Sequence, residues 1–113
     1  MQKKFLVLYR IPTHVIDAWM KTEESERKRQ EQEMMQEWGK WMGKHGSMIA
    51  STEVAAKTKL ANASGISDFR NDIHMTSILN ADSHEAAAQI FKDHPHFVIP
   101  EASIEIMELK PMG

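Results

Sequence analysis

The chain has 113 residues, 42% of them hydrophobic, which is enough for one hydrophobic core and too little for two. Its 14 lysines and arginines nearly balance its 16 aspartates and glutamates, so its charge gives no general attraction to nucleic acid or to anionic lipid. The absence of cysteine excludes disulfides, thiolate nucleophiles and zinc thiolate sites, and it fits a reducing compartment. We therefore expect one domain over residues 1–113, in the cytoplasm.

The first predicted strand covers residues 4–10 and is apolar on both faces, as a central strand is. One face carries Phe5, Val7 and Tyr9, and the other carries Leu6 and Leu8. This apolar run is too short, and is interrupted too soon by Pro12, for a signal peptide or a membrane span. We expect no association with a membrane.

Two helices are predicted next, a short one over residues 15–20 and a long one that ends at about His45. Thr22 is the expected N-cap of the long helix, because Glu23 and Glu24 follow it and face the positive end of the helix dipole. Gly46 is the expected residue after the helix, in the left-handed conformation that glycine accepts.

The two halves of the long helix differ in polarity. Residues 23–33 are charged on all sides, and the spacings of Glu23 to Arg27 and of Glu24 to Lys28 predict ion pairs one turn apart. The second half has the period of a buried stripe, formed by Met34, Trp38, Trp41, Met42 and His45. Only this second half is expected to pack on the core, although the two tryptophans are also spaced to stack on a planar ligand.

Alternating and helical patterns predict the remaining elements. Strands are expected over residues 47–54, 73–79 and 103–109, and the polar residues 55–71 are expected to form a loop or a long hairpin. A further helix, the second one that packs on the sheet, is expected to begin at Asp82 or Ser83 and to stop at Pro95. Its core stripe is Ala86, Ala87, Ile90 and Phe91.

The resulting order β-α-β-β-α-β predicts an α+β fold, with a four-stranded antiparallel sheet and both helices on one of its faces. In a two-layer domain of this size no element is left to cover the other face of the sheet. An apolar second face would then have to be hidden by a partner chain. We therefore expect an oligomer that forms through the open sheet face.

Six segments, in a fixed order along the chain, carry a resemblance to a known family. They are Lys4-Phe5-Leu6-Val7-Leu8-Tyr9, Glu37-Trp38-Gly39-Lys40-Trp41-Met42, Lys57-Thr58 through Gly65-Ile66-Ser67-Asp68, Asn80-Ala81-Asp82-Ser83-His84-Glu85-Ala86, Lys92-Asp93-His94-Pro95 and Ser103-Ile104-Glu105-Ile106. Together they resemble the YCII-related proteins over nearly the whole chain. The resemblance implies a ferredoxin-like fold that forms a dimeric α+β barrel, in which the sheets of two copies pack face to face as a homodimer.

The resemblance also implies small-molecule pockets between sheet and helices, and activities such as dehydrochlorination of a hydroxylated aromatic ring. In smaller members of the family a His on the first long helix is paired with an Asp, but that position falls near Met35 here. Asp68 matches a recurring acidic position of the family's loop, which the resemblance would place close to the mouth of the pocket.

Three of the six histidines, His74, His94 and His96, are the best candidates for chemistry, because imidazole suits proton transfer near neutral pH. His94 and His96 flank Pro95 and are expected to project to the same side, while His74 lies within a strand. The competing interpretation is a terminating turn whose imidazoles bond local carbonyls. A metal site on the three histidines would lack a carboxylate at the spacing of a recognised ligand set, so no metal is expected.

Asp68 is the fourth candidate catalytic residue, since a carboxylate near histidines orients an imidazole or acts as a base. A turn-forming aspartate that bonds its own backbone is the alternative interpretation. Arg70 in the same stretch has the chemistry to hold an anionic group, although a single loop arginine is usually solvated.

Two functional hypotheses remain open at this level. The first is an enzyme that acts on a small planar or aromatic metabolite by proton transfer, without an organic cofactor, through His74, His94, His96 and Asp68. The second is a non-catalytic dimer that binds a small ligand or serves as an interaction module. The enzyme requires at least two of these polar groups to converge in a concave site.

Overall fold

The computed structural model describes residues 2–113, and its centre is a four-stranded antiparallel sheet of order β2-β5-β1-β6. β1 (Lys3–Arg10) lies between β5 (Ile73–Ala81) and β6 (Ser103–Leu109), and β2 (Ile49–Val54) is the edge strand beyond β5. The register places Val7 opposite Ser77 of β5 and opposite Ile106 of β6. The strand that the sequence predicts as central is therefore central, and the bounds of β6 are those predicted.

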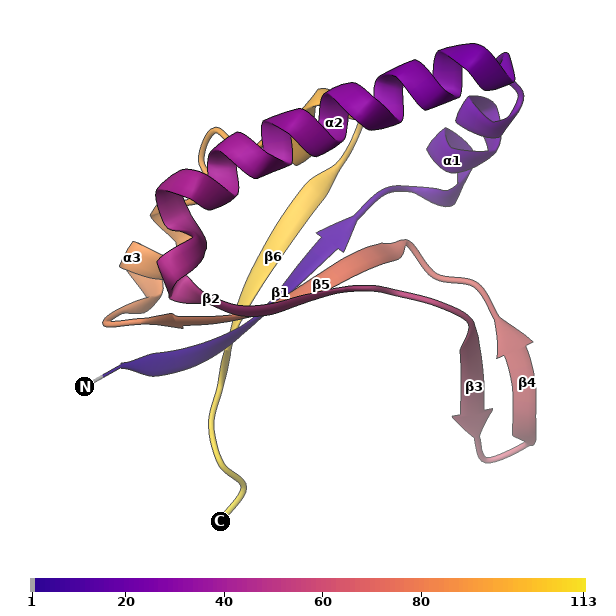
Figure 1. Cartoon of the computed structure of the whole chain (residues 1–113). Coiled ribbons are helices and arrows are strands. Elements are labelled where there is room, and N and C mark those ends of the chain that lie inside the picture. Colours follow the sequence, from indigo (N-terminus) through magenta and orange to yellow (C-terminus); the bar gives the residue numbers. More distant parts are fainter. Residues whose placement is uncertain (1) are drawn as a thin grey trace.

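Helix α2 (Glu24–His45) lies over one face of this sheet, as Figure 1 shows. α3 (His84–Gln89) and the short 3-10 helix η2 (Pro95–Val98) pack in the same layer, and α1 (Thr13–Met20) precedes α2. The α+β class is confirmed. The core between the two layers is formed by Phe5, Val7, Tyr9, Trp41, Leu79, Ala81, Ala87 and Phe91. Among the residues described, no helix has both the length and the apolar character needed to cross a bilayer.

Both predicted ends of α2 need correction. The N-cap is Glu23, because the Thr22 hydroxyl instead donates to the carbonyl of Trp19 at 2.6 Å and so closes α1. Gly46 has φ −60° rather than a left-handed conformation, since the chain continues directly into the 3-10 helix η1 (Gly46–Met48). This extra turn explains why β2 begins at Ile49 and not at Ser47.

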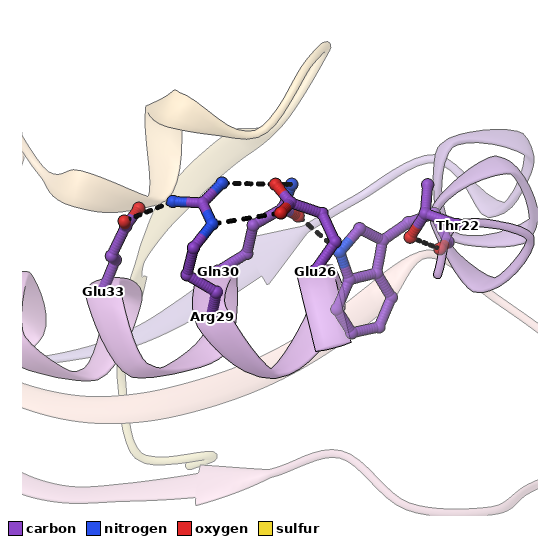
Figure 2. A network of polar contacts seen from close by, with 6 residues as sticks. Thr22, Glu26, Arg29, Gln30 and Glu33 are labelled. Carbon is purple, nitrogen blue, oxygen red and sulfur yellow. Dashed lines mark hydrogen bonds and ion pairs between the residues drawn. The ribbon is translucent and has the colours of Figure 1, made fainter. Parts of the chain in front are cut away.

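The polar first half of α2 is held by side-chain contacts along its surface. Figure 2 shows Arg29 donating to Glu26 and to Glu33, with Gln30 also bound to Glu26 at 3.2 Å. Gln30 accepts from the indole Nε1 of Trp19 at 2.7 Å, which ties α1 to α2. Exposed pairs of this kind contribute a few tenths of a kcal/mol each, roughly, and so support the helix without anchoring it.

One of the two predicted ion pairs in this half is present. Lys28 lies 3.4 Å from Glu24, as its spacing predicts. Arg27 does not pair with Glu23; it donates to the backbone carbonyls of Met20 and Thr22 at the end of α1. In the second half, Trp41 is buried in the core, and Trp38 and Met42 pack partly buried against it, so this half is the anchored one.

The second helical region is shorter and is capped by Ser83. The Ser83 hydroxyl accepts from the N–H of Ala86 at 3.0 Å, so Ser83 rather than Asp82 begins α3. The α-helix ends at Gln89, before Pro95, because the chain turns between Ile90 and His94. Pro95 instead occupies the start of η2, a position that suits a residue without an N–H.

The polar stretch of residues 55–71 is a hairpin rather than an irregular loop. β3 (Thr58–Asn62) pairs only with β4 (Gly65–Phe69) in a separate two-stranded sheet, seen apart from the main sheet in Figure 1. Gly65 has φ +130°, a conformation that residues with a Cβ rarely adopt, and the Asn62 side chain accepts from the N–H of Ser64 at 2.9 Å. The turn is therefore specified by Asn62 and Gly65.

Candidate functional site

Two of the four candidate catalytic side chains come together beneath α2. His94 and His96 flank Pro95 at the start of η2, and the Nδ1 atom of His94 accepts from the backbone N–H of His96 at 3.0 Å. Their residues are only 2% and 3% exposed. Pro95 restricts the backbone between them, and both imidazoles are buried in the core next to each other.

Aromatic rings surround the imidazole of His94. Its centroid lies 4.5 Å from that of Trp38 and 4.5 Å from that of Trp41, with Tyr9 at 5.6 Å and Phe91 at 5.8 Å. We call these five side chains the His94 cluster. The indole Nε1 of Trp41 donates to the carbonyl of Ile90 at 3.0 Å, which fixes that ring. Trp38 is the one aromatic ring of the cluster that is not fully buried.

The Nε2 atom of His94 is buried without a hydrogen-bond partner among residues 2–113. Because Nδ1 accepts an N–H, the neutral imidazole must carry its proton on Nε2, which is therefore a buried donor. Burial, with smaller contributions from His96 and His45, lowers the pKa of His94 to about 4. At neutral pH the ring is thus an uncharged donor, and it is a weak base for proton abstraction.

The side chain of His96 binds the end of β1. Its Nε2 lies 3.0 Å from the carbonyl oxygen of Arg10 at the end of β1, and burial lowers its pKa. The Arg10 guanidinium in turn binds Asp72 in a bidentate pair, at 2.9 and 2.8 Å, and also contacts Glu105 of β6. The hydrogen bond to Arg10 lowers the pKa of Asp72. The imidazole of His96 thus bonds a distant carbonyl and serves the packing of this end of the sheet.

A chain of hydroxyl groups leads from the His94 cluster to the edge of the sheet. The Tyr9 hydroxyl is 3.0 Å from Oγ of Ser77, which is 2.8 Å from Oγ1 of Thr52 on β2. Burial raises the pKa of Tyr9. From the sequence, Tyr9 and Ser77 are predicted only as strand residues. The sequence does contain a signal for this contact. A buried tyrosine hydroxyl needs a polar partner, and a serine on the same face of a neighbouring strand can supply it.

His74 and Asp68 do not join the His94 cluster. His74 lies in β5 and is exposed, and Asp68 lies in the outer hairpin, with a side chain 89% exposed that pairs with Lys59 of the opposite strand. Asp68 therefore bonds neither an imidazole nor its own turn. Over residues 2–113 no three histidines or carboxylates gather closely enough to hold a metal ion.

A shallow cleft of about 440 Å³ opens at the base of the hairpin. It is lined by Ala56, Lys57, Thr58, Phe69, Arg70, Asn71 and Ile73. Arg70, the predicted anion-binding residue, donates to both carboxylate oxygens of Asp17 in α1, the nearer at 2.9 Å. Its charge is thus already paired, and the cleft holds no buried polar group that calls for a ligand.

The chain matches no known family model, and no curated protein matches it either.

Proposed function

We propose that this chain is a YCII-like subunit of a dimeric α+β barrel that binds a small planar molecule beside His94. The observation that carries the proposal is the buried Nε2–H of His94, which lacks an acceptor among the described residues although aromatic rings surround it. Leaving such a donor unpaired costs about 1–3 kcal/mol, so a native structure that retains one calls for an explanation. A ligand that supplies an acceptor would remove this cost.

The surroundings of His94 define the class of ligand. The partly exposed ring of Trp38 offers a flat apolar face, which suits a planar aromatic molecule, and Nε2 of His94 needs an oxygen acceptor such as a phenolate, carboxylate or ring carbonyl. Access is expected past Trp38, because the other three rings are buried. The ligand would then replace part of the contact between Trp38 and His94.

The geometry supports binding better than proton transfer by a His–Asp pair. His94 is neutral at pH 7 with its pKa near 4, and Asp68 pairs with Lys59 on the outer hairpin. The His94 cluster itself contains no carboxylate that could act as a base. We therefore favour the ligand-binding dimer over the enzyme of the first hypothesis.

The dimer and the ferredoxin-like arrangement are supported by the main sheet. The strand order β2-β5-β1-β6, with antiparallel pairing throughout, is the order expected for a β-α-β-β-α-β chain of this type. On the face away from α2, Leu6 pairs with Ile78 and with Met107, and Met107 is 47% exposed. An apolar face of this kind is suited to a second copy of the same sheet.

Binding is tested by titration of the protein with 4-hydroxybenzoate and catechol as planar hydroxylated probes. Nitrogen NMR of labelled histidine should show the Nε2 resonance of His94 shifting, with a parallel change in tryptophan fluorescence. His94→Phe keeps a flat ring but lacks the donor, so it should bind the probes roughly tenfold more weakly. His14→Gln alters an exposed histidine elsewhere and serves as the matched control. Equal affinities of the two variants, or no shift at His94 with either probe, would contradict the proposal.

A further inference from the structure

The β3–β4 hairpin extends away from the body of the subunit. Every residue of its two strands except Thr58 is exposed. Figure 1 shows that the hairpin follows the end of β2, precedes the start of β5 and projects to the side of the main sheet away from α2. A lone two-stranded hairpin is at best marginally stable in water, so this hairpin needs another surface to pack on.

The side chains of the hairpin are suited to such a surface. The register places Leu60 and Phe69 on one face, while Ile66 lies opposite Ala61 on the other. Leu60, Phe69 and Ile66 are 37%, 47% and 76% exposed. Single exposed apolar residues are common, but on strands this short Leu60 and Phe69 make one face of the hairpin apolar and Ile66 adds an exposed apolar side chain to the other, so both faces favour contact with another protein surface.

The shape of the subunit indicates which surface that is. Its radius of gyration is 16.0 Å, whereas a compact domain of this length has about 13 Å. The chain measures 48 × 44 × 20 Å, so it is broad and thin. A second sheet on the open face would double the short dimension, and it would lie on the side toward which the hairpin projects.

We propose that the β3–β4 hairpin is an arm that grips the second copy of this chain. The inference rests on the proposed homodimer and adds a contact that the sheet faces alone do not provide. In a two-fold symmetric dimer each arm lies against the partner, so two equivalent arm contacts form. The ion pair of Arg70 with Asp17 links the base of the arm to α1.

The direct test is an isotope-filtered NOE experiment on the full-length chain. Equal amounts of methyl-labelled and unlabelled protein are mixed, after sedimentation has established the oligomeric state of the same sample. Intermolecular NOEs from the methyl groups of Ile66 and Leu60 are expected. A dimer without NOEs at these methyl groups would overturn the arm and leave the sheet-face dimer standing, whereas a monomer would overturn both.

A pair of matched substitutions gives a second readout. Ile66→Ser removes an apolar side chain from the arm, and Val98→Ser removes one of similar exposure, 78%, from η2 in the helical layer. Because the symmetric dimer loses two contacts, Ile66→Ser should raise the dimer dissociation constant roughly tenfold or more, and Val98→Ser should leave it unchanged. Circular dichroism checks that both variants keep the fold. Equal dissociation constants for the two variants would overturn the arm.

Discussion

His94 shows how one side chain acquires its properties from several distant parts of the chain. The backbone N–H of His96 fixes its tautomer, and tryptophans from α2 with Tyr9 from β1 exclude water from its ring. The ring is neutral because a buried imidazolium would be charged in surroundings that offer it no acidic partner. Positive charge on the neighbouring imidazole of His96 in η2 or of His45 in α2 would oppose its protonation further.

This environment predicts a specific pH dependence of stability. The folded pKa of His94 is about 4, below the ordinary value of 6.5, so the unfolded chain takes up a proton more readily as the pH falls. The free energy of unfolding should therefore drop between pH 6.5 and pH 4, by up to about 3 kcal/mol, and His96 should add to the drop in the same direction. Urea unfolding at pH 7, 5.5 and 4.5 measures this.

A variant isolates the contribution of His94. His94→Asn keeps a side-chain acceptor near the N–H of His96 but does not titrate, so its stability should fall less steeply over the same pH range. His14→Gln removes an exposed histidine and should retain the slope of the parent chain. If His94→Asn and the parent lost stability in parallel, burial of the neutral imidazole would not be the source of the pH dependence.

At the scale of single elements, short-range signals set the start of α3 and the turn of the hairpin. Ser83 caps α3, and the turn of the hairpin contains Asn62 and Gly65. The ends of α2 depend on what precedes and follows the helix. The Thr22 hydroxyl already donates to α1, and Gly46 is the first residue of η1. A residue type that favours a helix cap therefore does not form one where a neighbouring element uses its side chain or its backbone.

The cap of α3 gives a prediction at this scale. Ser83→Ala removes the acceptor of the Ala86 N–H and should destabilise the subunit by about 1 kcal/mol. Asp82→Ala, one residue earlier, is the matched control and should cost less, because Asp82 does not occupy the N-cap position. Chemical unfolding at pH 7 compares the two. A larger loss for Asp82→Ala would show that the cap seen here does not stabilise α3.

At the scale of the whole molecule, the two faces of the main sheet differ in what covers them. The face toward α2 holds the core residues Phe5, Val7 and Leu79. The opposite face presents apolar residues of β1, β5 and β6 on the side away from the helical layer. A subunit that is broad and thin buries less of its apolar surface than a compact one, which is the physical reason to expect a second copy.

The proposed homodimer predicts a response to charge on the open face. The parent chain should sediment as a dimer at micromolar concentration, and Leu6→Lys should make it monomeric, because an ammonium in a sheet-to-sheet contact would lose its hydration without a partner. Met35→Lys introduces the same charge at an exposed position of α2, with 74% exposure, and should remain dimeric. A parent chain that sediments as a monomer, or a dimeric Leu6→Lys, would rule out this interface.

The sequence by itself determined the α+β class, the central position of β1 and the extent of β6, because the pattern of apolar residues within one segment, on both faces in β1 and alternating in β6, reports directly on strands. Only the tertiary structure decided which of the candidate residues come together. It buries His94 and His96 together against residues of β1 and α2, and it leaves Asp68 on the outer hairpin. Burial and the choice of hydrogen-bond partner arise from contacts between segments far apart in the chain, and the spacing of residues within one segment does not encode them.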